Sequence, residues 1–491
     1  MKDLIRGQNK INLKRIGFLR FKKIGDDYLI TNDVGLFHYL SPSNFKKFVQ
    51  GRLSIRSKLY KLLVGKGFIE SKKSLKKRVS LFQVKTKNLL SRGPSLHIMA
   101  VTLRCNLRCV YCQASSRPLT EKKYDMSRAI AKKTVDFIFN TPCPNPTIEF
   151  QGGEPLVNWP VVKFIVEYSR KKAKEKNKML TISIVSNLIS MDEKKLEFLI
   201  KNGVHICTSL DGPREIHNKN RPYAQGDSYK ITTSWIRKMQ KIYADLEKKT
   251  KGRDKRTVGA LATISTLSIN NLKKIIDEYL KFGFYSIHLR PITYLGFGQA
   301  YQGERGYSAE KFIEKWKKAL DYIISLNKKG INFYEREAWL MLQKILTDTF
   351  TGYTDLESPC GAVLGQILYN HDGQIYTCDE GRMLENDIFK LGEINRANYR
   401  EIVLSKKTKT MLASSCLENT TCDLCVFRPY CGICPVRNYV YYGSLFPQIK
   451  NTDWCKIKIA QFDYLFTKMK DPEIKRIFEK WVGLRTNKVK R

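Results

Sequence analysis

The sequence has no stretch that approaches the roughly 20 uninterrupted apolar residues needed by a membrane-spanning helix. Charged residues follow Met1 closely, so the apolar core of a signal peptide is missing as well. We therefore expect a soluble, cytoplasmic protein with no membrane insertion. Disulfides are rare in the cytoplasm, so the 13 cysteines, which cluster at short spacings, are expected to be metal ligands.

Histidine and acidic residues are also scarce. The six histidines lie apart from metal-like spacings and predict no histidine metal site. The 46 Asp and Glu face 88 Lys and Arg, which leaves a net charge of +42. Such a surface favours an anionic partner, either nucleic acid, an anionic membrane face or an acidic peptide, and it equally fits Lys-rich solvated helix faces. Charge alone therefore does not choose a partner.

The length of 491 residues and the 42% apolar content predict several folded domains rather than disorder. Residues 1–70 contain two strand-like runs, DDYLITND and GLFHYL, followed by helical stretches after Ser41 and Ser54. This order suits a small winged-helix-like module. A basic linker is expected over 71–95, because Lys and Arg are dense there.

Strand-like runs alternate with helical stretches over residues 96–305. The runs are LHIMAVTL, TIEFQ, LTISIVS, VHICTSL, VGALATIS and YSIHLRP. Such alternation predicts an α/β fold with a parallel sheet, either an open doubly wound sheet or a curved partial barrel, with ligands at the carboxyl ends of the strands. The rest of the chain is expected to comprise a helical connection (306–350), a cysteine-rich and turn-rich region (351–460) and a helix with a basic tail (461–491).

Three cysteines follow the first of these strands, in the order Cys105-Asn-Leu-Arg-Cys109-Val-Tyr-Cys112. Three thiolates on one loop can hold an iron–sulfur cluster that keeps one iron open for a ligand, whereas structural zinc normally takes four closed protein ligands. A zinc knuckle with a distant fourth ligand is the alternative.

Polar and glycine residues follow the next three strands. Gly152 and Gly153 would allow close backbone approach to a ligand, and Glu154 can accept hydrogen bonds from a cationic amine. The remaining candidates for cofactor binding are Ser186, Asn187, Asp211 and Arg221. A strand-end polar pair can also be a helix cap, and the aspartate can simply shape a turn.

The cysteine loop and the Gly-Gly-Glu motif resemble the radical S-adenosylmethionine (SAM) superfamily over about 200 residues. The resemblance implies a partial (β/α)6 barrel and a 4Fe-4S cluster on Cys105, Cys109 and Cys112. It further implies that the methionine part of SAM chelates the open iron, with Tyr111 near the adenine. Cleavage of SAM then gives a 5′-deoxyadenosyl radical that abstracts hydrogen from the substrate.

Seven more cysteines recur after the barrel, and their pattern resembles a SPASM domain, the extension that carries auxiliary 4Fe-4S clusters. The resemblance implies an outer cluster on Cys422, Cys425, Cys431 and Cys455, and an inner cluster on Cys360, Cys378 and Cys434. The fourth ligand of the inner cluster is either Cys416 or absent, which would leave an open iron. Two structural zinc ions are the alternative.

Longer stretches, among them TLRCNLRCVYCQAS, TSLDGPREIHNKNRP and YNHDGQIYTCDEGRML, resemble the His-Xaa-Ser system radical SAM maturases. The resemblance implies modification of a ribosomally made precursor peptide or small protein, with the N-terminal module as its docking site and a flavodoxin or ferredoxin as electron donor.

Three alternatives remain open. One is an anaerobic sulfatase-maturating type of enzyme, which oxidises Cys or Ser in a protein and needs a general base that the sequence does not single out. Another is an RNA-modifying enzyme, although no RNA-binding module is recognisable and we do not expect nucleic acid as a partner. The last is a scaffold that cleaves no SAM.

Overall fold

The computed structural model describes residues 15–91, 93–303, 306–349, 351–352, 354–384 and 386–484. Residues 1–14, which belong to the expected N-terminal module, and residues 485–491 of the expected basic tail lie outside this part of the chain.

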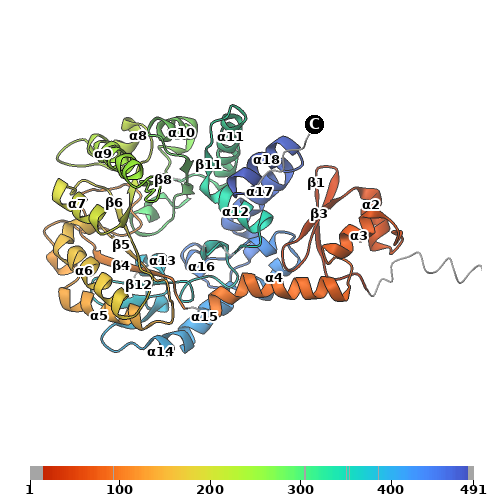
Figure 1. The fold of residues 1–491 in the computed structure, drawn as a ribbon, viewed down its shortest axis with the longest axis horizontal. Coiled ribbons are helices and arrows are strands. Elements are labelled where there is room, and N and C mark those ends of the chain that lie inside the picture. Colours follow the sequence, from red (N-terminus) through yellow and green to blue (C-terminus); the bar gives the residue numbers. More distant parts are fainter. Residues whose placement is uncertain are drawn as a thin grey trace, which may run out of the picture.

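A three-stranded antiparallel sheet followed by two short helices forms the N-terminal module (Figure 1). The sequence predicted its second and third strands but not the first, whose RFKKI segment is mostly basic. Ser41 and Ser57 cap the two helices by accepting the backbone N–H groups of Asn44 and Tyr60. The elements are β1 (Arg20–Ile24), β2 (Asp27–Thr31), β3 (Phe37–Leu40), α2 (Pro42–Val49) and α3 (Lys58–Gly65).

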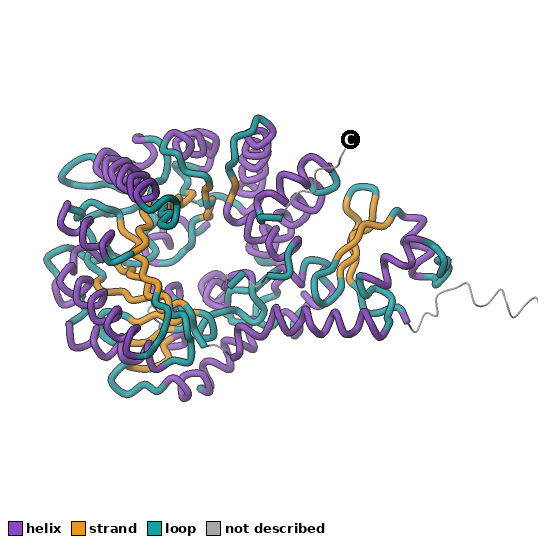
Figure 2. Tube along the Cα trace, viewed as in Figure 1, coloured by secondary structure: helices purple, strands orange, loops and turns teal. Residues whose placement is uncertain are grey.

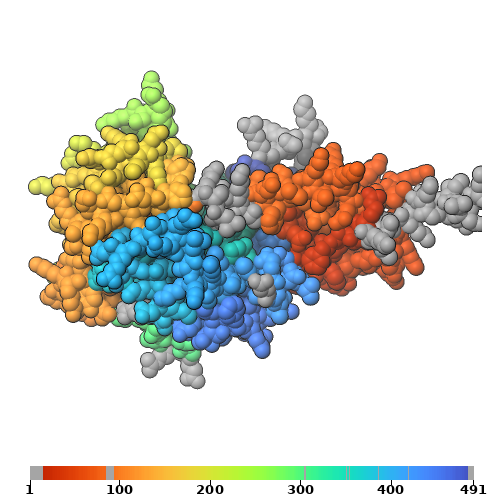
Figure 3. All heavy atoms as spheres, turned by 90° about the horizontal axis from the view of Figure 1, so that it is seen from below, coloured from red at the N-terminus to blue at the C-terminus, as the bar shows by residue number. Residues whose placement is uncertain are grey.

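The segment expected as a basic linker is largely a 20-residue helix, α4 (Lys72–Ser91). It contains no Gly or Pro, and Lys, Leu and Arg are good helix formers. The helix runs from the N-terminal module to the first strand of the main sheet (Figure 1), and the module itself projects from one end of the molecule (Figure 3). The basic residues of this segment thus belong to a regular element rather than to a flexible tether.

The six strands that the sequence predicted pair in parallel in their chain order, so the expected α/β class with a central parallel sheet is confirmed. The strands curve, and the helices between them lie along the convex side (Figure 2). The strands are β4 (Leu96–Thr102), β5 (Thr147–Gly152), β6 (Thr181–Ser186), β7 (Val204–Ser209), β8 (Gly259–Ile264) and β10 (Leu289–Pro291). The helices are α5 (Arg128–Asn140), α6 (Trp159–Glu175), α7 (Glu193–Lys201), α8 (Arg214–Asn220), α9 (Ser228–Lys249) and α10 (Leu272–Lys281).

Helices close the other side of the barrel. The short strand β9 (Ser286–Ile287) pairs in parallel with β11 (Tyr334–Glu335), between α11 (Ala309–Lys328) and α12 (Arg336–Leu346). Helix α17 (Asp453–Lys468) packs against α11 and also against β1 of the N-terminal module. It was not predicted, whereas the final helix α18 (Pro472–Trp481) was.

The cysteine-rich region adds three strands to the main sheet, which the sequence did not predict. Strand β12 (Gln366–Tyr369) pairs in parallel with β4, and β13 (Gln374–Tyr376) and β14 (Lys390–Glu393) follow in antiparallel order. A tight turn with Gly373 at φ 84° joins the first two. The region also contains α13 (Asp379–Met383), α14 (Tyr399–Leu404), α15 (Lys406–Ser415) and α16 (Pro435–Tyr442). This pairing holds the region against the first strand of the barrel.

Candidate functional site

The three-cysteine loop begins directly after β4 and is held by backbone hydrogen bonds. Cys105 N–H donates to the carbonyl of Arg117 at 3.0 Å, and the loop also bonds to the segment after α8. Burial is the main cause that raises the pKa of the Cys109 thiol to about 12, and the neighbouring Cys112 raises it further. The structure therefore brings the loop thiols close together in a poorly solvated place, where a positive metal centre would stabilise their thiolates.

Nitrogen donors point at two of these sulfurs. Asn187 Nδ2 lies 3.6 Å from Cys105 Sγ, and Arg221 Nη1 lies 3.7 Å from Cys109 Sγ. The backbone N–H of Leu107 adds a third donor, 3.4 Å from Cys105 Sγ. Hydrogen bonds to cluster sulfurs are a usual means of tuning iron–sulfur centres. Three thiols on one loop, with donors aimed at them, fit a cluster with one iron left open.

Gly152 and Gly153 bring the end of β5 against the end of β4. An added Cβ at Gly152 would lie 2.0 Å from the carbonyl oxygen of Thr102, and one at Gly153 would lie 2.3 Å from that of Arg104. Both neighbours are backbone atoms that cannot move aside cheaply. In this structure the glycines thus allow strand ends to meet at the cysteine loop, a close approach different from the approach to a ligand that the sequence predicted.

Glu154 lies buried behind the loop and holds the next strand end. Its carboxylate accepts hydrogen bonds from Leu156 N at 3.0 Å, Ser186 Oγ at 2.8 Å and Asn187 N at 2.7 Å. Burial raises its pKa to about 7 in spite of these donors. A carboxylate has about four acceptor positions, so one remains for an amine. The predicted amine-binding role of Glu154 is compatible with these contacts.

Asp211 has no solvent exposure and joins the other predicted residues to one another. It pairs with Arg221 at 3.0 Å and accepts hydrogen bonds from Tyr111 and from Asn220. The Arg221 guanidinium also lies 5.4 Å from the centre of the Tyr111 ring. Through these contacts Asp211 positions the side chains of Arg221 and Tyr111.

The cysteines after the barrel form two groups. Apolar side chains surround Cys360, Cys378 and Cys434 in one small cluster, and Cys422, Cys431 and Cys455 pack around another. Burial raises the pKa of Cys431, and the neighbouring Cys425, Cys422 and Cys455 raise it further. The first set is here called the inner group and the second, with Cys425, the outer group; their binding of clusters stays a prediction.

Two thiols of the inner group cap helices. Cys378 precedes α13 and accepts a hydrogen bond from Gly381 N at 3.3 Å, and Cys434 precedes α16 and accepts one from Arg437 N at 3.5 Å. The positive end of a helix stabilises a thiolate. The donor chemistry of the inner group therefore also suits metal binding.

Two carboxyls beside the inner group, the half-buried Asp379 and the buried Glu380, were missed by sequence reasoning. Asp379 and Glu380 follow Cys378 directly, within the stretch YNHDGQIYTCDEGRML, so their proximity to this cysteine was readable. Gln366 Nε2 donates to Asp379 Oδ1 at 3.5 Å, and burial raises the Asp379 pKa. Cys416, the other candidate ligand, directly follows Ser415 in sequence. The Ser415 Oγ accepts a hydrogen bond from the backbone N–H of Cys360 at 3.0 Å.

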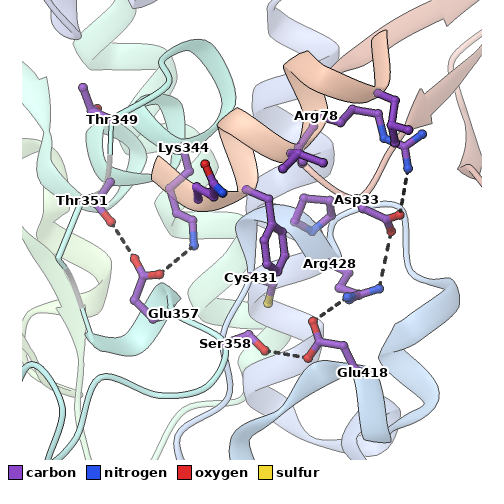
Figure 4. Close-up of a pocket in the computed structure, with 16 residues that line it drawn as sticks. Asp33, Arg78, Lys344, Thr349, Thr351, Glu357, Ser358, Glu418, Arg428 and Cys431 are labelled. Atoms are coloured by element: carbon purple, nitrogen blue, oxygen red, sulfur yellow. Dashed lines mark hydrogen bonds and ion pairs between the residues drawn. The ribbon is translucent and has the colours of Figure 1, made fainter. Parts of the chain in front are cut away.

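A pocket of about 530 Å³ lies between the N-terminal module, α4 and the outer group (Figure 4). On α4 its lining includes Leu75, Val79 and Phe82, whose side chains are 50 to 57% exposed. On the other side Arg428 pairs with Glu418. The pocket reaches Cys431 of the outer group, as Figure 4 shows. A concave, partly apolar lining with a few charged groups is typical of ligand-binding pockets.

Two features are absent from the described part of the chain. No helix there is long and apolar enough to cross a membrane. Among the same residues, no three His, Cys, Asp or Glu side chains converge where a single metal ion could sit.

Comparisons with known proteins agree with this geometry. Residues 99–250 match the Radical SAM superfamily model. A cysteine-type anaerobic sulfatase-maturating enzyme of Clostridium perfringens is 25% identical over 364 residues, which cover 69% of this chain and 87% of that protein. A solved structure described as native anSMEcpe with bound AdoMet is similar with a TM-score of 0.62 at 21% identity, and the match covers 78% of this chain and 99% of that chain. Streptococcus suis SuiB bound to precursor peptide SuiA has a TM-score of 0.52 at 11% identity, with coverages of 89% and 98%.

Proposed function

We propose that the protein modifies a ribosomally made peptide in a His-Xaa-Ser type system, on the premise that residues 99–250, which match the Radical SAM superfamily model, form a radical SAM domain. The observation that carries the proposal is the meeting of the three-cysteine loop with Asn187 and Arg221 at one end of the sheet. The inner and outer groups support it, because auxiliary clusters accompany peptide and protein maturation in the family that the sequence resembles.

The bound groups in this proposal would be SAM and three 4Fe-4S clusters, of which the cluster at Cys105, Cys109 and Cys112 would cleave SAM and supply a 5′-deoxyadenosyl radical at the substrate. Cys105, Cys109 and Cys112 hold the first cluster. Glu154 accepts the amine of SAM, and Arg221 is available to its carboxylate while Asp211 keeps the guanidinium in place. Tyr111, fixed by Asp211, limits where the adenine can lie. A flavodoxin or ferredoxin supplies the electron.

The same proposal assigns peptide docking to the N-terminal module and to the pocket of Figure 4. Its occupant is a segment of the precursor with an apolar side chain for the α4 wall. An acidic leader would be gathered by the net charge of +42, so we expect its association to weaken with added salt.

The decisive test is anaerobic reconstitution of the full chain, followed by assay of 5′-deoxyadenosine. Replacing Cys105, Cys109 or Cys112 singly with Ala should abolish cleavage of SAM, and Cys143→Ala, a buried thiol outside all three sets, should retain it. Co-expression with a small protein that carries His-Xaa-Ser repeats, followed by mass spectrometry with fragmentation, should then locate the modification. Intact clusters without any 5′-deoxyadenosine would remove the enzymatic proposal.

A second candidate is oxidation of Cys or Ser in a protein, as in the sulfatase-maturating relative. The observation that favours it is Asp379, a half-buried carboxyl beside the inner group whose pKa is raised by desolvation and which can serve as the required general base. Under this alternative, Asp379→Asn should form 5′-deoxyadenosine but no oxidised product. Because loss of two hydrogens fits both oxidation and crosslinking, fragment masses must decide between the two candidates.

A further inference from the structure

The inner group offers three thiols, although a 4Fe-4S cluster has four irons to ligate. Its remaining iron needs a further donor or stays open. Helix α13 places a carboxylate there: Glu380 Oε2 accepts a hydrogen bond from Cys434 Sγ at 3.3 Å, and Glu380 is only 6% exposed. Glu380 lies two residues after Cys378, so one short helix carries both a thiol and this carboxylate.

The three thiols of the inner group lie in one small apolar cluster. Glu380 follows Cys378 by two residues on α13 and contacts Cys434, which precedes α16. Its carboxylate therefore lies between the two helix starts that carry Cys378 and Cys434.

Loading the cluster would leave this carboxylate without its present donor. A thiol that binds iron gives up its proton, so Cys434 could no longer donate to Glu380 Oε2. The other oxygen, Oε1, keeps Arg437 Nη2 at 3.7 Å. A buried carboxylate oxygen without a partner is costly, and iron accepts oxygen as well as sulfur ligands. Coordination of Glu380 Oε2 to the remaining iron would give this oxygen a partner and would give the iron a protein ligand.

We propose that Glu380 is the fourth protein ligand of the inner auxiliary cluster. The inference rests on the proposed function to the extent that this cluster exists. It replaces the two earlier options, Cys416 or an open iron, with a carboxylate that the fold already holds in place. The substrate would then meet a fully ligated inner cluster.

The test uses the full chain, reconstituted with ⁵⁷Fe in a background where Cys105, Cys109 and Cys112 are Ala, because the open iron of the first cluster would mask the result. Iron content and Mössbauer and EPR spectra are compared with and without added imidazole. We expect imidazole to leave the parent protein unchanged and to alter the spectrum of Glu380→Gln. Glu380→Cys should restore insensitivity to imidazole, and Cys416→Ser should behave as the parent does.

Three results would overturn the inference: an imidazole-sensitive parent, a Glu380→Gln spectrum identical to the parent, or sensitivity in Cys416→Ser alone. If Glu380→Gln loses the inner cluster entirely, Glu380→Cys decides, because failure to recover the iron would contradict a ligand role. Iron content equal to a single cluster in the parent would instead remove the proposed pair of auxiliary clusters. If the wild-type chain still formed 5′-deoxyadenosine in that case, the proposed radical chemistry would stand and only the inference about the inner cluster would fail.

Discussion

Arg20 of β1 forms an ion pair with Asp423, whose Oδ1 lies 3.2 Å from its Nη2, although 403 residues separate the two in sequence. Asp423 stands between Cys422 and Cys425 of the outer group. Arg20 is only 2% exposed and also pairs with Asp33 at 2.9 Å. The N-terminal module is therefore fastened to the loop that carries the outer cysteines.

Replacing Arg20 with Met should weaken both the module and the outer cluster. The variant loses hydrogen bonds to charged partners, but both carboxylates are more than a third exposed and regain water, so we expect a loss of about 2 kcal/mol in the free energy of unfolding. Chemical denaturation and iron analysis measure the two effects. Lys23→Met, on the exposed face of the same strand, is the matched control. Unchanged stability and iron content in Arg20→Met would show that this ion pair does not couple the two parts.

Replacing Gly153 with Ala should prevent the three-cysteine loop from holding its cluster. The new Cβ would stand 2.3 Å from the carbonyl oxygen of Arg104, and relief requires the backbone just before Cys105 to move. We expect loss of 5′-deoxyadenosine formation and of the iron on the loop. Gly65→Ala in α3 is the control, since no atom lies within 4 Å of its added Cβ, and it should stabilise the chain by about 0.5 kcal/mol. Normal cluster loading in Gly153→Ala would show that the strand ends can separate without harm.

Much of this site was predictable because its residues follow strands in order. Parallel strands bring their carboxyl ends to one edge, so Cys105, Glu154, Asn187 and Asp211 were expected together from their positions alone. Glu154 and Asn187 do meet, through a 2.7 Å hydrogen bond. The membership of the inner and outer groups followed from the family pattern and not from spacing.

Other features depend on contacts that sequence patterns do not carry. The pairing of β12 with β4 joins segments more than 260 residues apart, although the Asn370-His-Asp-Gly373 turn between β12 and β13 was a readable hairpin signal. The contact of Glu380 with Cys434 likewise forms only when α13 and α16 pack. The α4 helix was read as a linker because its basic residues obscured a sequence with good helix propensity.

The contribution of Glu335 to the stability of the chain should fall as the pH rises from about 4.5 to about 7. This buried carboxyl accepts hydrogen bonds from Ala338 N at 2.7 Å and Leu289 N at 3.1 Å, yet burial raises its pKa to about 7. A raised carboxyl pKa adds stability at low pH that is lost as the pH passes through the folded-state value. The shift corresponds to about 3 kcal/mol at most.

The Glu335→Gln variant isolates this effect, because other groups titrate in the same range. We expect the difference in unfolding free energy between wild type and variant to shrink or reverse across this pH window, as measured by urea unfolding at a series of pH values. Glu310→Gln is the control: this exposed carboxyl has a lowered pKa, so its contribution changes below the window. A difference that stays constant from pH 4.5 to pH 7 would contradict the role of Glu335.

Replacing Val79 with Asp should weaken precursor binding without disturbing the clusters. Val79 is 50% exposed and lines the pocket that reaches Cys431, so a charge there removes apolar contact area and must be desolvated when a peptide segment binds. We expect the dissociation constant of the precursor to rise roughly tenfold, which corresponds to about 1.4 kcal/mol. Fluorescence anisotropy of the labelled precursor measures it. Val84→Asp is the matched control, because Val84 lies on the same helix, is 48% exposed and does not line the pocket. Equal affinities for the two variants would place the peptide elsewhere, whereas selective loss in Val79→Asp with unchanged 5′-deoxyadenosine formation would assign the pocket to the substrate.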